Sequence, residues 1–189
     1  MKKLAIAVCN NGDMINSTFF WNFNAIAKPK DFQIMTFRGT SRIKSASLNE
    51  VTIEATKWGF DYILYWDYDV VLPQNAINKL LSHDLPVVGG LYHLKNTPYS
   101  PVAGWTFMEN GFRVLSNQGK KKVWKYDFAI FPEGDENGLV EVEWCGIGCL
   151  LVKRDVFGKI NWEKKKFYDV WNYQSGTRSY GHDINFCFD

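Results

Sequence analysis

Short apolar segments alternate with segments of helical periodicity along the first half of the chain, and this order restricts the folds open to it. Most of the apolar segments lack a polar side, which is typical of strands buried on both faces of a sheet. Such strands alternating with helices indicate an α/β sandwich, in which helices cover both faces of a mostly parallel sheet. The expected strands are residues 3–8, 32–37, 61–66 and 85–94, with helices at 17–27, 41–58 and 73–82.

Helix boundary signals support these segments. Thr40 or Ser41 can cap the second helix, and Gly59 stands where a glycine ends it. Pro73 is placed to open the third helix.

The second half of the chain has a different pattern. Short runs broken by glycines in residues 102–123 predict hairpin strands, and residues 132–138 read as a polar loop. Two strands and a helix are expected at 140–144, 148–152 and 154–160. The length favours one domain, 1–189, in which residues 1–100 and residues 101–189 form two halves of different pattern.

Composition argues against several classes of protein. The net charge of +2 without a basic stripe argues against nucleic acid as a partner, and no apolar run approaches the ~20 residues of a membrane span. The apolar N-terminal run breaks at Asn10, so it predicts a strand rather than a signal peptide, and we expect a cytoplasmic protein.

Four separated cysteines indicate neither a disulfide scaffold nor a zinc site. The high aromatic content, 16%, fits either an aromatic core or a groove for sugar rings.

The most informative motif is the pair Asp67 and Asp69, directly after the apolar strand 61–66. Residues two apart on an extended chain point to the same side, and open α/β sheets bind ligands beyond the carboxyl ends of their strands. Two neighbouring carboxylates repel each other, and a divalent cation removes that repulsion. Mg²⁺ or Mn²⁺ takes one or two carboxylates together with water and phosphate oxygens.

Two other interpretations of these acids remain open. They can merely start a turn before Pro73. They also match the start of a haloacid-dehalogenase-like phosphohydrolase, although that motif normally ends the first strand and needs a later acidic pair.

Four motifs in order resemble the GT-A-fold glycosyltransferases, especially those of the family 2 type. The likeness runs through most of the chain, in segments 49–69, 89–92, 145–157 and 181–187. It implies a Rossmann-like three-layer GT-A fold and transfer of a sugar from a nucleoside-diphosphate sugar to an acceptor hydroxyl of a glycan or glycoprotein. In such a domain residues 1–100 would be the nucleotide-binding half, and the antiparallel half, 101–189, would face the acceptor. Sequence alone leaves the oligomeric state open.

The resemblance also implies roles for individual residues. Asp67 would lie near the ribose and the metal, Asp69 would ligate Mn²⁺ or Mg²⁺, and Asp183 would be the base of an inverting displacement. The turn after the first strand would approach the nucleotide base. Its residues are Cys9, Asn10 and Asn11, and Asn49 falls in the matching helix as a further nucleotide contact.

The chain departs from the family pattern at two places. Leu48 stands where the family has an arginine, and Arg42 or Lys44 can substitute for it. His182 stands where an acid usually precedes the late Asp183, which makes His182 a candidate metal ligand or acid/base group.

Four further residues are candidates for the sugar or acceptor site. His93 ends an expected strand near the cleft, and Trp144 either walls the sugar site or packs in the core. Gly146 and Gly148 would let a ligand approach the backbone. A non-catalytic module that binds a nucleotide-sugar or glycan is the alternative to an enzyme.

Overall fold

The centre of the molecule is a mixed five-stranded sheet with the strand order β2-β1-β3-β8-β4. The computed structural model describes residues 1–9, 15–95, 101–109, 112–116, 135–136, 138–160, 167, 170–172, 177–180 and 186. The α/β class is confirmed, but the sheet is less parallel than expected, because β8 from the second half lies antiparallel between β3 and β4. The strands are β1 Lys2–Cys9, β2 Phe32–Gly39, β3 Tyr62–Trp66, β4 Val87–Gly89 and β8 Cys149–Lys153.

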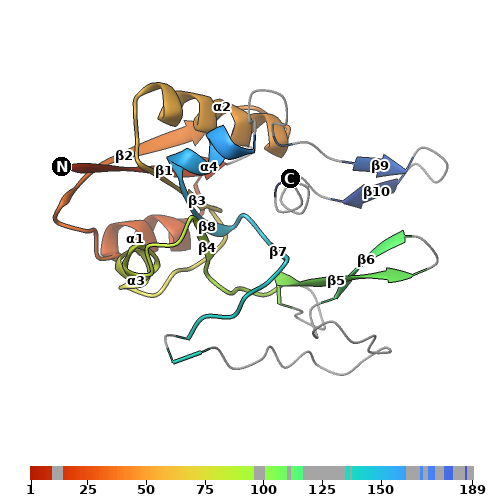
Figure 1. Cartoon of the computed structure of the whole chain (residues 1–189). Coiled ribbons are helices and arrows are strands. Elements are labelled where there is room, and N and C mark those ends of the chain that lie inside the picture. The colour runs from red at the N-terminus through yellow and green to blue at the C-terminus, as the bar shows by residue number, and fades with distance from the viewer. Residues whose placement is uncertain are drawn as a thin grey trace.

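Helices cover both faces of this sheet (Figure 1). Helices α2 (Lys44–Lys57) and α4 (Arg154–Lys159) lie on one face, and α1 (Ser17–Ala25) and α3 (Ala76–Ser82) lie on the other. No helix in the described part of the chain is both long enough and apolar enough to span a bilayer.

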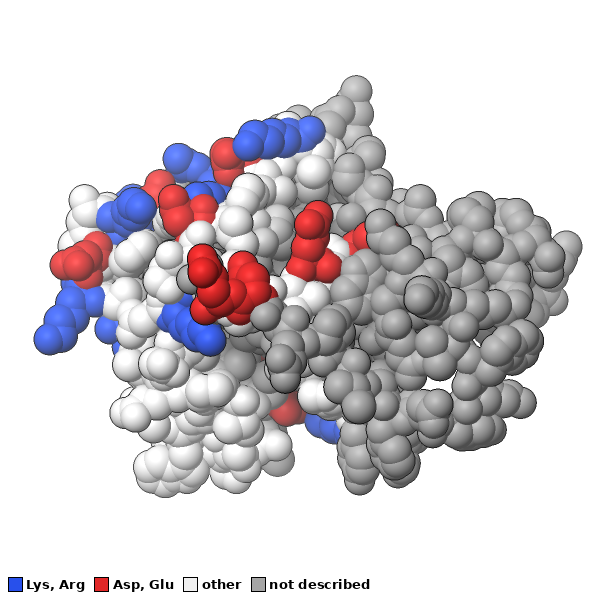
Figure 2. Space-filling view, turned by 60° about the horizontal axis from the view of Figure 1, so that its bottom comes forward, with Lys and Arg blue, Asp and Glu red and all other residues white. Residues whose placement is uncertain are grey.

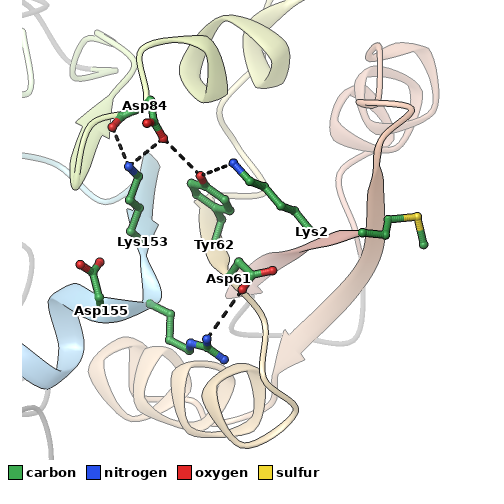
Figure 3. Close-up of a pocket in the computed structure, with 8 residues that line it drawn as sticks. Lys2, Asp61, Tyr62, Asp84, Lys153 and Asp155 are labelled. Carbon is green, nitrogen blue, oxygen red and sulfur yellow. Dashed lines mark hydrogen bonds and ion pairs between the residues drawn. The ribbon is translucent and has the colours of Figure 1, made fainter.

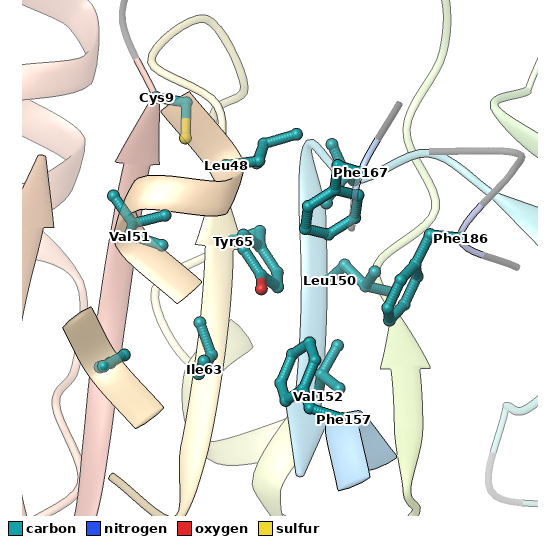
Figure 4. Packing of buried hydrophobic residues seen from close by; sticks show 14 of the residues in the cluster. Cys9, Leu48, Val51, Ile63, Tyr65, Leu150, Val152, Phe157, Phe167 and Phe186 are labelled. Atoms are coloured by element: carbon teal, nitrogen blue, oxygen red, sulfur yellow. The ribbon is translucent and has the colours of Figure 1, made fainter. Parts of the chain in front are cut away.

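The core consists of two clusters, one on each face of the sheet. Strand β1 shows the division: Ala5 and Ala7 pack under α2, whereas Leu4 and Ile6 pack on the opposite side. This burial of both faces explains why the strands read as continuous apolar runs. Figure 4 shows the first cluster, in which Tyr65 lies between α2 and the side chains of β8.

The second half adds small antiparallel elements beside the main sheet. Strands β5 (Ala103–Glu109) and β6 (Phe112–Ser116) form a hairpin, and β7 (Trp144–Cys145) pairs with β5. Strands β9 (Val170–Asn172) and β10 (Thr177–Tyr180) form a second antiparallel pair. The hairpin expected in residues 102–123 is therefore present. Of the strand expected at 140–144, only the last residue, Trp144, lies in a strand, as the first residue of β7.

Other elements are also shorter than predicted. The strand expected at 85–94 covers only Val87–Gly89, because β8 pairs with just these three positions before the chain leaves the sheet. The helix expected at 73–82 starts at Ala76, after a turn in which the Ala76 amide donates to the Pro73 carbonyl at 3.0 Å. Helix α2 starts at Lys44 rather than 41, and its N-cap Ile43 lacks a side-chain cap.

The end of α2 follows the predicted glycine signal. Gly59 has a φ of +71°, and its amide donates to the Thr56 carbonyl at 3.0 Å. The Phe60 amide donates to the Ala55 carbonyl at 3.1 Å, which completes a Schellman motif. The motif turns the chain directly into β3 and places Phe60 in the core.

We expect Gly59→Ala to lower the free energy of unfolding by about 1–2 kcal/mol, because alanine pays a steric cost at a left-handed φ. Urea unfolding followed by circular dichroism measures this change. The matched control is Gly158→Ala in α4, where an added Cβ meets no atom within 4 Å. That control should stabilise the protein or leave it unchanged, and equal destabilisation by both variants would contradict the assignment.

Candidate functional site

The predicted site lies at the carboxyl edge of the parallel strands, where β1 and β3 end and α2 begins. Burial raises the pKa of the Cys9 thiol at the end of β1 to about 12. The Asp67 carboxylate adds to this shift, whereas the Lys44 ammonium opposes it. The three side chains therefore lie close enough to interact, as expected for a ligand edge of an α/β sheet.

Asp67 and Asp69 lie in a turn rather than on an extended chain. The Val70 amide donates to the Asp67 carbonyl at 3.0 Å and closes the turn. The Trp66 indole Nε1 donates to the Val70 carbonyl at 2.8 Å, and the Asp67 amide donates to the Gly148 carbonyl at 3.0 Å. The extended-chain argument for a shared side is therefore wrong, and the backbone of the turn is instead fixed by contacts with its neighbours.

Each carboxylate lies against a lysine from another part of the chain. The Lys44 Nζ is 2.5 Å from Asp67 Oδ2, and the Lys95 Nζ is 2.6 Å from Asp69 Oδ2. The hydrogen bond to Asp69 raises the pKa of Lys95 above its ordinary value. The site thus consists of two lysine–aspartate ion pairs rather than two unpaired carboxylates.

The two ion pairs differ in how well they are shielded from water. The exposed fraction of the side chain is 15% for Asp67 and 32% for Lys44, but 30% for Asp69 and 69% for Lys95. Exposed lysine–aspartate pairs contribute about 1 kcal/mol or less, so the Asp69 pair costs little to separate. Lys44 also occupies the first turn of α2, where the helix dipole disfavours a cation and Asp67 offsets that cost.

The chemistry of these two carboxylates fits Mg²⁺ or Mn²⁺. Both ions take hard oxygen ligands, typically one or two carboxylates with water and phosphate oxygens in the remaining positions. Among the described residues no group of three or more His, Cys, Asp or Glu side chains could hold a metal ion. If a metal binds here, Asp67 and Asp69 would hold it with two carboxylates and leave its other positions to water or to oxygens of a ligand.

Tyr92 fills the space beside the two glycines predicted to admit a ligand. A Cβ at Gly146 would lie 2.0 Å from the Tyr92 hydroxyl oxygen, and a Cβ at Gly148 would lie 2.8 Å from the same ring system. The Gly148 amide donates to that hydroxyl at 3.0 Å. These glycines therefore accommodate the Tyr92 side chain rather than a ligand. A Cβ at Gly148 would also lie 3.2 Å from Asp67 Oδ2, so Tyr92 and Asp67, the candidate metal ligand, both lie next to Gly148.

Asn49, predicted to contact the nucleotide, instead holds a distant part of the chain. Its Nδ2 donates to the Phe167 carbonyl at 3.1 Å, and the Phe167 amide donates to its Oδ1 at 2.9 Å. Both ends of the side-chain amide are therefore engaged with one backbone residue 118 positions away.

The remaining predicted residues are dispersed. Cys9 is buried, with its side chain in the core cluster under α2, so only its backbone can approach a ligand. Trp144 is 8% exposed in β7, which favours the core-packing interpretation, and Arg42 and His93 are exposed. His93 forms an isolated bridge with Pro101. Asn10, Asn11, His182 and Asp183 lie outside the described residues.

Lys95 is the residue that sequence reasoning missed. It follows β4 by six positions and belongs to none of the motifs considered above, so only its 2.6 Å contact with Asp69 identifies it. Lys44 was foreseen only as a substitute for a missing arginine, and its contact with Asp67 places it in the site.

A separate hollow of about 580 Å³ lies at the opposite, amino edge of the sheet (Figure 3). Four of its charged side chains form two ion pairs: Lys153 lies 2.7 Å from Asp84, and Arg154 lies 3.7 Å from Asp61. The hydrogen bond from Lys153 holds the pKa of Asp84 below its usual range. Because ligands of open α/β sheets bind at the carboxyl edge, we do not assign the site to this hollow.

The described part of the surface in Figure 2 carries acidic and basic side chains side by side, without a continuous basic area. Extended basic areas are the electrostatic footprint of nucleic-acid binding. The absence of a nucleic-acid partner stays a prediction from the net charge of +2.

Comparison with known proteins shows likeness in fold alone. No family model matches the chain, and no curated protein matches it. Among solved structures, the crystal structure of A197 from STIV matches with a TM-score of 0.51 and 17% sequence identity. The match covers 100% of this chain and 77% of that chain.

These findings correct the family assignment. The four motifs resemble the family 2 type of GT-A glycosyltransferases, yet the full-length structural match is to A197 from STIV, and no family model recognises the chain. Membership of that family is therefore wrong. The first motif, 49–69, combines features that many α/β sheets share, namely a helix ended by glycine and acids after a buried strand, so it does not identify a family.

We expect Asn49→Ala to lower the free energy of unfolding by about 2 kcal/mol, because it leaves the amide and carbonyl of Phe167 without these two hydrogen bonds. Binding of Mn²⁺ and nucleotides should stay unchanged. Denaturant unfolding and calorimetric titration measure the two effects. Asn24→Ala is the control, because exposed Asn24 bonds a single carbonyl within α1, and a selective loss of nucleotide binding in Asn49→Ala would restore the original prediction.

Proposed function

We propose that this chain is a metal-dependent glycosyltransferase that moves a sugar from a nucleoside-diphosphate sugar to an acceptor hydroxyl. The observation that carries the proposal is the placement of Asp67 and Asp69 in a fixed turn directly after β3, next to the start of α2. This is the edge where α/β sheets bind nucleotides. The finer fold assignment, a Rossmann-like three-layer sandwich of the GT-A type, is part of the proposal and is supported by the helices on both faces.

In this proposal each residue has a defined task. Asp67 and Asp69 would hold Mn²⁺ or Mg²⁺, which, when bound, neutralises the charge that builds on the departing diphosphate. Lys44 and Lys95 add positive charge at the same edge. From the sequence, Asp183 would take the proton of the acceptor hydroxyl in an inverting displacement, with His182 beside it as a further acid/base group.

One observation favours a second candidate, a non-catalytic module that binds a nucleotide-sugar or glycan. Asp67 and Asp69 each form an ion pair with a lysine, so their negative charges are neutralised without a metal. Such a site could bind phosphates through its lysines and perform no transfer. The acceptor, a glycan or glycoprotein, and the cytoplasmic location stay predictions in either case.

Thermal-shift measurements with nucleoside-diphosphate sugars, with and without Mn²⁺, separate the two candidates. Stabilisation that requires Mn²⁺, together with slow hydrolysis of the donor, supports the transferase. Stabilisation without hydrolysis or transfer supports the binding module. Turnover of an aryl phosphate would instead support the phosphohydrolase considered from the sequence.

We expect Asp69→Asn to weaken Mn²⁺-dependent binding of the donor by more than about tenfold, because the amide lacks the charge of a carboxylate ligand. Asp69 is preferred to Asp67 for this test, since its pair with Lys95 is exposed and the fold should tolerate the change. Asp155→Asn is the control, because Asp155 is also an exposed aspartate paired with a lysine. Donor affinity that is equal in Asp69→Asn and the parent protein would rule out the metal role.

The base assignment has its own test. Asp183→Asn should leave donor binding intact and reduce transfer by about 100-fold or more, as expected when a general base is removed. Calorimetry measures binding, and a coupled assay for the released nucleoside diphosphate measures turnover. Full transfer activity in the variant would show that another group accepts the proton.

A further inference from the structure

We propose that Lys44 and Lys95 exchange partners during binding. They hold Asp67 and Asp69 while the metal is absent, and they bind the phosphates of the donor once a divalent cation has taken the carboxylates. The inference rests on the proposed function and deepens it, because it assigns the phosphate ligands of the donor.

The contacts of the two lysines support an exchangeable role. Lys44 comes from the start of α2 and Lys95 from the segment after β4, yet both ammonium groups converge on the turn after β3. Each contact given above joins only the ends of two side chains, and lysine has a long flexible stem with a single point charge. The ammonium groups can therefore move onto another anion nearby without any change in the backbone.

The position of Lys44 at the start of α2 also supports phosphate binding. A cation in the first turn of a helix is disfavoured by the helix dipole, and the first turn of α2 contains no acid. The same dipole favours an anion at this end of the helix. A phosphate beside Lys44 would thus interact favourably with both the ammonium group and the helix.

Charge balance indicates the kind of donor. The two carboxylates and two ammonium groups sum to zero, so a bound divalent cation leaves two uncompensated positive charges. A nucleoside diphosphate esterified to a sugar carries two negative charges on its diphosphate, one on each phosphodiester. The loaded site would therefore be neutral with a nucleoside-diphosphate sugar, whereas a singly charged phosphodiester, as in a nucleoside-monophosphate sugar, would leave it positive.

Single substitutions of the two lysines test the exchange. Lys44→Met and Lys95→Met keep an unbranched apolar stem and remove the charge, and Lys159→Met is the matched control. Lys159 is 69% exposed, like Lys95, and pairs with an aspartate at 2.9 Å, but this pair lies within α4. Circular dichroism and thermal unfolding verify that each variant is folded, and Lys44→Gln provides a second uncharged variant in case Lys44→Met does not fold.

The first readout is Mn²⁺ binding alone, followed by electron paramagnetic resonance. Removing either lysine should strengthen Mn²⁺ binding about fivefold, because a competing positive charge leaves the carboxylate. The second readout is calorimetric titration of Mg²⁺-loaded protein with inorganic pyrophosphate, a probe that carries no base or sugar. Here the same variants should bind about tenfold more weakly, because each loses a charged hydrogen bond to phosphate.

The opposite signs of the two effects distinguish exchange from simple neutralisation. If Mn²⁺ binding strengthens but pyrophosphate affinity stays within twofold of the parent protein and of Lys159→Met, the lysines only balance the acids and the inference is overturned. Unchanged Mn²⁺ affinity in both lysine variants also overturns it. A parent protein that binds no Mn²⁺ overturns the proposed function itself, and the exchange with it.

Discussion

The candidate site depends on how firmly β3 is held. All five residues of Tyr62–Trp66 are buried, β1 pairs with one edge of the strand and β8 pairs with the other. A strand that is paired on both edges and covered on both faces cannot slip by one residue, because every side chain would move to the opposite cluster. The position of Asp67 is therefore set by the core of the protein, and the bond from its amide to the Gly148 carbonyl adds a restraint from the far half of the chain.

This constraint makes the two acids unequal. Asp67 is the more buried of the pair and lies against a lysine at the start of a long helix, so it belongs to the framework as much as to the site. Asp69, two residues further, is more exposed and its partner is mostly in water. A cation that entered here would separate the weaker Asp69 pair first, since partial burial strengthens the interaction between Asp67 and Lys44.

The sequence predicted the features that local signals determine. Strands β1, β2 and β3, helix α2 and its glycine end follow from apolar runs, periodicity and the φ that Gly59 permits. The sequence did not reveal features that depend on distant partners: β4 is short because β8 pairs with three of its residues, and Asn49 is engaged by Phe167. Likewise Asp67 and Asp69 were found from their spacing, but their pairing with Lys44, which lies in the predicted helix, and with Lys95, which lies outside every motif, depends on the folded chain. The family assignment failed for a related reason, because motifs set by general α/β geometry do not distinguish one family from another.

The two charged edges of the sheet show why ion pairs alone do not identify a site. At the amino edge the acidic residues are also bound to backbone: Asp61 Oδ2 accepts from the Lys3 amide at 2.8 Å, and the Asp61 carbonyl accepts from the Arg154 amide at 2.9 Å. Lys153 likewise donates to the Asp84 carbonyl at 2.6 Å, so its ammonium group also fixes the loop before β4. Releasing those charges would loosen the connections between strands. At the carboxyl edge the pair of Asp69 with Lys95 joins two side chains whose release leaves the hydrogen bonds of the turn intact, and the proposed exchange of partners for a ligand rests on this difference.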